Sequence, residues 1–145
     1  MAIRQVEPPE AAAILEADPE ALYLDVRTEE EFGAGHPTGA INVPIMFMIP
    51  GRPQPNADFL VVVEKNLPKG KKLVVGCLSG GRSQRACETL EEAGYTDLTN
   101  MRGGFGGARD ASGSIAVKGW RDAGLPVSQD LGDATYQALR AKAGL

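Results

Sequence analysis

The 145-residue sequence lacks features that mark several classes of protein. No apolar run approaches the length of a membrane-spanning helix, so no membrane association is expected. The first residues include Glu7 and Glu10 but no hydrophobic segment, which argues against a secretory signal. Basic residues form no cluster and the net charge is −4, so nucleic acid is not an expected partner.

Cysteine and histidine are also scarce: the chain has two cysteines, Cys77 and Cys87, and one histidine, His36. Two cysteines without an export signal indicate reduced thiols in a cytoplasmic protein, not a disulfide framework. A cysteine–histidine dyad would have to use His36, which we expect to be structural. Cys87 falls on the apolar face of a predicted helix, so core packing is expected in preference to a role as a resolving thiol. No metal and no organic cofactor are expected.

What the sequence does contain is an alternation of apolar strands and amphipathic helices. Strands are expected over residues 3–6, 21–26, 40–43, 72–75 and 95–101, and helices over residues 10–17, 28–32, 56–67, 83–93 and 133–143. This alternation predicts a three-layer α/β fold, with a central, mostly parallel sheet and helices on both faces. The length suits one domain over residues 1–145, with the last helix as an appendage.

Three segments are harder to assign. Residues 56–67 fit a strand by the propensity of three consecutive valines, but apolar residues at helical spacing favour a helix. Residues 45–55 lie between proline and glycine breakers and are expected to be irregular. Residues 103–119 are rich in glycine and serine and predict a long loop, in which a surface insertion over residues 106–119 is favoured over a lid.

The most informative stretch is residues 74–83, which predicts a buried strand, a tight turn that starts at Cys77, and the start of a helix. Gly80 and Gly81 allow the backbone to fold so that several N–H groups point inward. These groups, the positive end of the helix and the Arg82 guanidinium would surround the sulfur and favour the thiolate. The sequence therefore predicts a nucleophile at Cys77; the alternative is a small apolar residue that ends a core strand.

Several motifs in register resemble the rhodanese domain family, and the resemblance covers nearly the whole chain. They are Leu24-Asp25-Val26-Arg27 with Glu30-Glu31-Phe32, Gly35-His36, Gly39 to Pro44, the loop from Cys77 to Ser83, Gly94-Tyr95 and Gly103-Gly104-Phe105. The resemblance implies a small α/β fold and a cysteine that accepts a sulfane sulfur as a persulfide and passes it to a second nucleophile. It implies that Cys77 is catalytic and that the substrate is bound by Leu78, Ser79, Gly80, Gly81, Arg82 and Ser83.

The activity that this resemblance implies is that of a sulfurtransferase, which moves sulfur from thiosulfate or a persulfide to cyanide or a thiol. The partners would be a small anionic sulfur donor and a thiophilic acceptor. An alternative is a binding or sulfur-relay module that acts with a sulfur-accepting protein. A cysteine phosphatase or arsenate reductase fits less well, because those loops have five residues between cysteine and arginine and this loop has four, Leu78 to Gly81.

Two further details bear on the site. Many rhodaneses that use thiosulfate have a cation directly after the cysteine, whereas this chain has Leu78. A less charged, partly apolar persulfide therefore fits Leu78 and the apolar segment at residues 46–48 better as a donor. Asp25 and Arg27 lie near the end of a neighbouring strand, where we expect a structural ion pair that supports the loop without direct chemistry.

Overall fold

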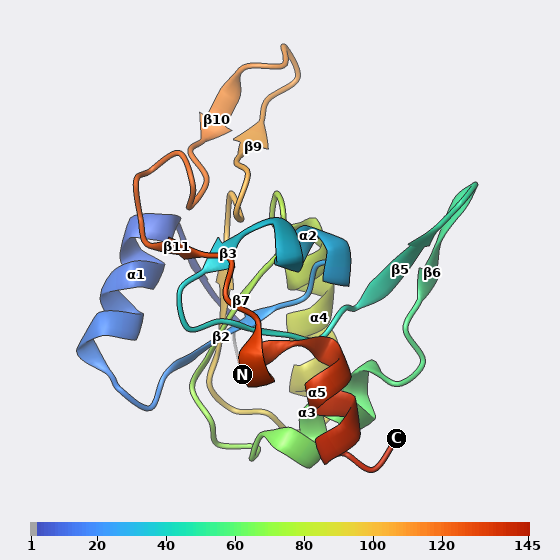
Figure 1. Ribbon diagram of the computed structural model, residues 1–145. Coiled ribbons are helices and arrows are strands. Elements are labelled where there is room, and N and C mark those ends of the chain that lie inside the picture. The colour runs from blue at the N-terminus through green and yellow to red at the C-terminus, as the bar shows by residue number, and fades with distance from the viewer. Residues whose placement is uncertain (1–2) are drawn as a thin grey trace.

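A computed structural model describes residues 3–145 and shows a central sheet of five strands (Figure 1). The strands are β1 (Arg4–Val6), β2 (Leu22–Asp25), β4 (Ile41–Asn42), β7 (Leu73–Gly76) and β8 (Leu98–Met101). Their order is β1-β8-β7-β2-β4, and every neighbouring pair is parallel. The expected α/β fold with a parallel sheet is thus confirmed, with β1 at an edge.

Helices cover both faces of this sheet (Figure 1). They are α1 (Pro8–Ala17), α2 (Glu29–Ala34), α3 (Phe59–Asn66), α4 (Gly81–Glu92) and α5 (Tyr136–Lys142), with a 3-10 turn at Gly132–Ala134 before α5. Alternate side chains of β7 serve two cores: Leu73 and Val75 pack with α3, α4 and α5, whereas Val74 packs with α1 and α2. Among the described residues, no helix is long and apolar enough to cross a membrane.

Local sequence explains where two helices form. The Thr28 side chain accepts a hydrogen bond from the Glu31 N–H at 3.2 Å, and the Glu31 carboxylate accepts one from the Thr28 N–H at 3.1 Å. This capping box confirms the predicted start of α2. The segment with three valines is α3, so the helical interpretation is confirmed; Val62 and Val63 are fully buried, and that burial outweighs strand propensity.

The expectation of an irregular segment over residues 45–55 is wrong. β5 (Met46–Ile49) and β6 (Arg52–Pro55) form an antiparallel hairpin that projects from the body of the molecule (Figure 1). Gly51, with a φ of +94°, allows the tight turn. Pro53 and Pro55 alternate along β6, so the N–H groups that they lack fall on its outer edge, while Gln54 between them pairs with β5. Prolines at these positions are therefore compatible with a strand.

Residues 103–119 are also more ordered than a long loop. β9 (Ala108–Arg109) and β10 (Ile115–Val117) form a short antiparallel hairpin, which projects at the top of Figure 1. The expectation of a loop is wrong for these strands. Their pairing has an irregular register, and alternating polarity is too brief in two or three residues to be recognised in a sequence.

His36 has a structural role. It belongs to β3 (His36–Pro37), which pairs with β11 (Val127–Ser128). The buried imidazole stacks on the Phe32 ring with the ring centres 3.7 Å apart, and its Nδ1 lies 2.8 Å from the Phe32 carbonyl oxygen. These contacts tie β3 to α2.

Gly76→Ala is expected to destabilise the fold. A methyl group at Gly76 would overlap the hydroxyl of Tyr23, which is buried on the neighbouring strand β2. Because overpacking a rigid core costs about 1–3 kcal/mol, the free energy of unfolding should fall by at least this amount. Urea denaturation measures the change. Gly70→Ala is the control, because a methyl group there meets nothing within 4 Å. Equal stability of the two variants would contradict the predicted clash.

Candidate active site

Cys77 lies at the carboxyl end of the central strand β7, where parallel sheets commonly bind ligands. The chain then turns, and α4 begins at Gly81 with Gly80 as its N-cap. Gly80 has a φ of +118°, a conformation that residues with side chains rarely adopt, and its N–H donates to the Cys77 sulfur at 3.1 Å. The sulfur therefore faces the positive end of a 12-residue helix.

Ser83, in the first turn of α4, is a second polar neighbour of the sulfur. Its Oγ lies 3.5 Å from the Cys77 Sγ, 3.1 Å from the Gly80 carbonyl oxygen and 2.5 Å from the Oδ1 of Asn100, a buried residue of β8. The hydroxyl can rotate, so it can donate either to Asn100 or to a thiolate. Sequence reasoning included Ser83 but missed Asn100, because the two residues meet only through the packing of α4 on β8.

The Cys77 side chain is buried. The residue is 1% exposed and belongs to the core that packs with α3, α4 and α5. Burial alone would suit an ordinary core cysteine, but such a residue needs no main-chain donor. Within residues 3–145, the Gly80 N–H is the only main-chain donor to this sulfur. The geometry thus provides one inward N–H where the sequence suggested several.

Cys87 lies in the same core and is fully buried. Burial raises the pKa of its thiol to about 12. A thiol with this pKa stays protonated at neutral pH and is a poor nucleophile. These properties are those of a packing residue, not of a resolving thiol.

In the part of the chain that the structure describes, the Arg82 guanidinium bonds to Glu31 and not to the sulfur. Its Nη1 and Nη2 donate to the two carboxylate oxygens at 2.8 and 3.0 Å. Partial burial alone would raise the pKa of Glu31, but hydrogen bonds from Arg82 and Thr28 outweigh it and lower the pKa to about 2. Sequence reasoning placed Arg82 on the sulfur and Glu31 in a helix cap. It missed the pair, since the two residues are 51 positions apart.

The Gly103-Gly104-Phe105 motif holds the cysteine loop by its main chain. The Phe105 N–H donates to the Cys77 carbonyl oxygen, and the Gly106 N–H donates to the Leu78 carbonyl oxygen, both at 2.8 Å. Gly104 has a φ of +56°, and a Cβ there would lie 2.5 Å from the Leu78 carbonyl group. Only glycine permits this close approach, so the motif belongs to the site although it is distant in sequence.

Asp25 and Arg27 form a buried ion pair behind the loop. Arg27 donates to both Asp25 carboxylate oxygens at 2.8 to 3.2 Å and to the Gly35 carbonyl oxygen at 2.7 Å. Burial raises the pKa of Asp25, and the hydrogen bonds from Arg27 oppose this rise. The Arg27 guanidinium lies 4.5 Å over the Phe105 ring centre. The pair thereby positions Phe105, which in turn holds the Cys77 carbonyl.

Two hollows flank the Leu78 side chain, which is 42% exposed. The larger, about 590 Å³, we call the methionine groove; it is lined by Thr28, Glu30, Glu31, Met46, Met48, Pro53, Leu78 and Arg82. The smaller, about 250 Å³, lies on the other side and includes Arg27, Phe105 and Arg121. The Cys77 side chain lines neither hollow. Of residues 77–83, Leu78 lines both hollows and Arg82 lines the larger one.

Comparison with known proteins places residues 7–111 in a match to the family described as Rhodanese-like domain. The chain is 46% identical over 83 residues to thiosulfate sulfurtransferase 16, chloroplastic, of Arabidopsis thaliana. This match covers 57% of this chain and 69% of that protein. It is 44% identical over 89 residues to Protein HIGH ARSENIC CONTENT 1, mitochondrial, of the same plant. This second match covers 61% of this chain and 53% of that protein.

A solved structure has the same fold. The crystal structure of Rv0390 from M. tuberculosis superposes with a TM-score of 0.74 and 31% sequence identity, covering 90% of this chain and 100% of that one. The chain spans about half the length of several curated relatives, with 53% and 46% of two Arabidopsis proteins covered. The similarity therefore concerns only part of the length of these relatives.

Glu31→Gln keeps the shape of the side chain but removes the charge that pairs with Arg82. Because the folded-state pKa of Glu31 is about 2, below its ordinary 4.5, the pair stabilises the fold above about pH 4.5 and ceases to do so as the pH falls through about 2. The variant should be less stable at neutral pH by about 1 kcal/mol. This difference should disappear between those two pH values.

Urea unfolding at a series of pH values measures this effect. Glu30→Gln is the matched control, because it removes the same charge from an exposed neighbour. A stability difference that stays constant across the acidic range would show that the ion pair does not contribute it.

Proposed function

The chain belongs to the rhodanese-like domain family, and we propose that it is a sulfurtransferase whose nucleophile is Cys77. The observation that carries the proposal is the 3.1 Å hydrogen bond from the Gly80 N–H to the Cys77 sulfur at the start of α4. The thiolate is the form of cysteine that attacks sulfur. The N–H and the helix end stabilise negative charge, which supports both a thiolate and the outer sulfur of a persulfide at this position.

The reaction has two balanced steps. The Cys77 thiolate attacks the outer sulfur of the donor, the S–S bond of the donor breaks, and the leaving group departs with the electron pair; with thiosulfate it is sulfite. Cys77 then carries a persulfide with one negative charge. Cyanide or a thiolate attacks the outer sulfur, the bond to Cys77 breaks, and the original thiolate returns with thiocyanate or a new persulfide as product. A thiol acceptor first gives its proton to solvent.

Local charge favours a donor with little negative charge. Arg82 is neutralised by Glu31, and Arg27 by Asp25. The residue after the nucleophile, Leu78, is apolar and partly exposed, so it offers nothing to a dianion. The methionine groove provides an apolar approach instead. An organic persulfide of low charge is therefore a better donor than thiosulfate. A thiol on a partner protein could accept the sulfur by the same attack on the persulfide. The proposal therefore includes a role in sulfur relay.

Arsenate reduction is the second candidate, because one relative is named for high arsenic content. Four residues separate Cys77 from Arg82, and Arg82 is paired with Glu31. The loop therefore has few free donors for a tetrahedral oxyanion, which needs several. An assay with arsenate and a thiol reductant tests this candidate. Arsenite formation faster than sulfur transfer would reverse the order of the two.

Mixing the protein with thiosulfate or an organic persulfide is expected to add one sulfur, about 32 Da, which cyanide then removes as thiocyanate. Cys77→Ser should abolish both results, because the serine hydroxyl is a much weaker nucleophile at neutral pH. Cys87→Ala, which removes the buried thiol, should retain them. Intact-mass spectrometry and a colorimetric thiocyanate assay make the measurements. Thiocyanate release by Cys77→Ser at the wild-type rate would falsify the proposal.

Leu78→Lys is expected to raise kcat/KM for thiosulfate by about tenfold at low salt, because it adds an unpaired cation beside the nucleophile. The gain should shrink at high salt, where charges on the surface are screened. Leu78→Met is the matched control. The value for an organic persulfide, which carries a single negative charge, should rise less. An equal gain for both donors would mean that Leu78 acts through access to the sulfur and not through charge.

A further inference from the structure

A row of polar side chains leads from the Cys77 sulfur toward the surface of the molecule. The Ser83 Oγ lies 3.5 Å from the sulfur and 2.5 Å from the Oδ1 of Asn100, and the Asn100 Nδ2 donates to the Gln5 Oε1 at 2.8 Å. Asn100 is buried in β8, and Gln5 is its direct partner in the pairing of β1 with β8. The edge strand β1 thus supplies a side chain to the surroundings of the sulfur.

The row continues over the outside of α4. The Gln5 Nε2 donates to the Gln84 Oε1 at 2.7 Å, and the Gln84 Nε2 donates to a carboxylate oxygen of Glu88 at 3.2 Å. Gln5 and Glu88 are exposed. We call Asn100, Gln5 and Gln84 the amide network. It connects the buried hydroxyl of Ser83 to a carboxylate on the surface.

The direction of the hydrogen bonds in this network follows from its last contact. An ionised carboxylate only accepts hydrogen bonds, so Gln84 turns its NH2 group to Glu88 and its oxygen to Gln5. Gln5 then turns its oxygen to Asn100, which presents its own oxygen to Ser83. The Ser83 hydroxyl therefore donates its hydrogen to Asn100 and presents a lone pair to the sulfur.

This arrangement suits a thiol better than a thiolate. The Cys77 S–H can donate to the Ser83 Oγ, whereas a thiolate needs the Ser83 hydroxyl to turn and donate to it. The turn would take the donor away from the Asn100 oxygen, and an unsatisfied buried acceptor costs free energy. The other acceptor near the hydroxyl, the Gly80 carbonyl oxygen, is farther away at 3.1 Å and already accepts the Gln84 N–H.

We propose that Asn100 is a positioning residue of the sulfur site, which acts through Ser83 and favours the thiol form of free Cys77. The Gly80 N–H and the end of α4 act in the opposite direction, because they stabilise negative charge. The inference rests on the proposed sulfurtransferase function, in which the free Cys77 thiolate attacks the donor. The amide network then sets how much of this thiolate is present at a given pH.

Other titratable groups near the sulfur do not obscure this effect. Burial raises the pKa of Tyr23, on β2, well above its ordinary value and raises that of Cys87, on α4, to about 12, so both stay protonated where a cysteine titrates. The charged side chains around the loop form the pairs Asp25 with Arg27 and Glu31 with Arg82. The variants below leave all these groups in place, so a change in the pH dependence of alkylation reports on Cys77.

Asn100→Leu keeps the size of the side chain and removes the acceptor, which frees the Ser83 hydroxyl for a thiolate. The midpoint of the pH dependence of Cys77 alkylation by iodoacetamide should fall by about one unit, the effect of one net hydrogen bond. Below the midpoint, kcat/KM for thiosulfate should rise by about threefold, because a larger thiolate fraction is partly offset by lower nucleophilicity. This gain should be lost above the midpoint.

The same substitution in a Ser83→Ala background shows whether Asn100 acts through the hydroxyl. Once the hydroxyl is absent, Asn100→Leu should no longer move the midpoint, so the two substitutions should be strongly non-additive. An equal shift in both backgrounds would mean that Asn100 acts by a general loosening of the core. That result would overturn the proposal.

Glu88→Gln tests the direction of the network without a change in the core. A glutamine donates as well as accepts, so the amides are no longer held in one direction. The midpoint should fall by about a third of a unit, a part of the effect of Asn100→Leu. Glu92→Gln, one turn further along α4 and also exposed, is the matched control for the lost charge. Equal shifts in these two glutamine variants would contradict the proposal.

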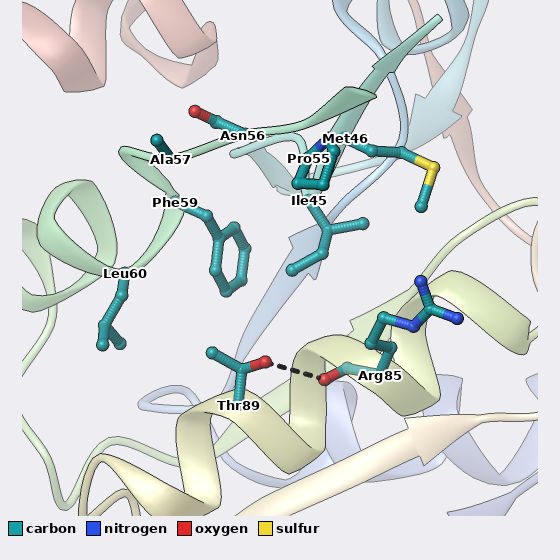
Figure 2. A pocket seen from close by; sticks show the side chains of 9 residues that line it. All are labelled: Ile45, Met46, Pro55, Asn56, Ala57, Phe59, Leu60, Arg85 and Thr89. Carbon is teal, nitrogen blue, oxygen red and sulfur yellow. Dashed lines mark hydrogen bonds between the residues drawn. The ribbon is translucent and has the colours of Figure 1, made fainter. Parts of the chain in front are cut away.

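Thr89→Val is the control for a disturbance of α4 itself. Figure 2 shows Thr89 on a different flank of the helix, where its hydroxyl donates to the Arg85 carbonyl oxygen at 3.1 Å. That flank lines a hollow of about 320 Å³ together with Phe59 and Leu60. The variant removes one side-chain hydrogen bond from the same helix and should leave the midpoint unchanged. A shift as large as that of Asn100→Leu would attribute the effect to the helix and overturn the proposal.

Alkylation needs no sulfur donor, so these experiments separate the inference from the proposed function. The expected shifts in a protein that gains no sulfur from thiosulfate or a persulfide would reject the sulfurtransferase and retain the role of Asn100. Sulfur transfer through Cys77 with an unchanged midpoint in Asn100→Leu would reject the role of Asn100 alone.

Discussion

The hydrogen bond from the Phe105 N–H to the Cys77 carbonyl oxygen, 2.8 Å long, is the constraint on which the site depends. Together with the bond between Gly106 and Leu78, it occupies the first two carbonyl groups of the loop. These two carbonyl groups accept hydrogen bonds from the segment after β8. The N–H of Gly80 and the N-terminal end of α4 are then the dipoles that face the sulfur. The loop is thus shaped by the turn after β8 as much as by its own glycines.

Charge in the site is arranged in closed pairs. Asp25 with Arg27 and Glu31 with Arg82 each cancel locally, so the sulfur anion that we propose at Cys77 would be stabilised mainly by main-chain dipoles. Such dipoles do not titrate and act over a short range. With a net charge of −4, the protein would therefore offer the proposed anionic donor no long-range attraction.

The parts of the fold that the sequence predicted are those with local signals. The apolar strands, the Thr28–Glu31 capping box and the position of Cys77 after a buried strand all depend on neighbours in the sequence. The β5–β6 hairpin was not predicted, because prolines normally break strands. The two prolines of β6 are compatible with a strand only because they alternate, so that both missing N–H groups fall on its outer edge.

The site itself was predicted less completely, because its contacts join distant segments. The pair between Glu31 and Arg82 exists because β2 and β7 are adjacent and end at the same edge of the sheet. Asn100 reaches Ser83 from β8 for the same reason. The number of N–H groups that face the sulfur depends on individual backbone angles, such as the φ of Gly80, which a residue type permits but does not dictate.

The prolines on the outer edge of β6 have a consequence for solubility. A two-stranded ribbon that extends into solvent exposes unpaired main-chain groups, and these can recruit a strand from another molecule. All four residues of β6 are exposed, but Pro53 and Pro55 remove the donors from that margin. Intermolecular sheet growth, the first step toward fibrils, is therefore blocked along β6. The β5–β6 hairpin can therefore form one wall of the methionine groove without initiating aggregation along β6.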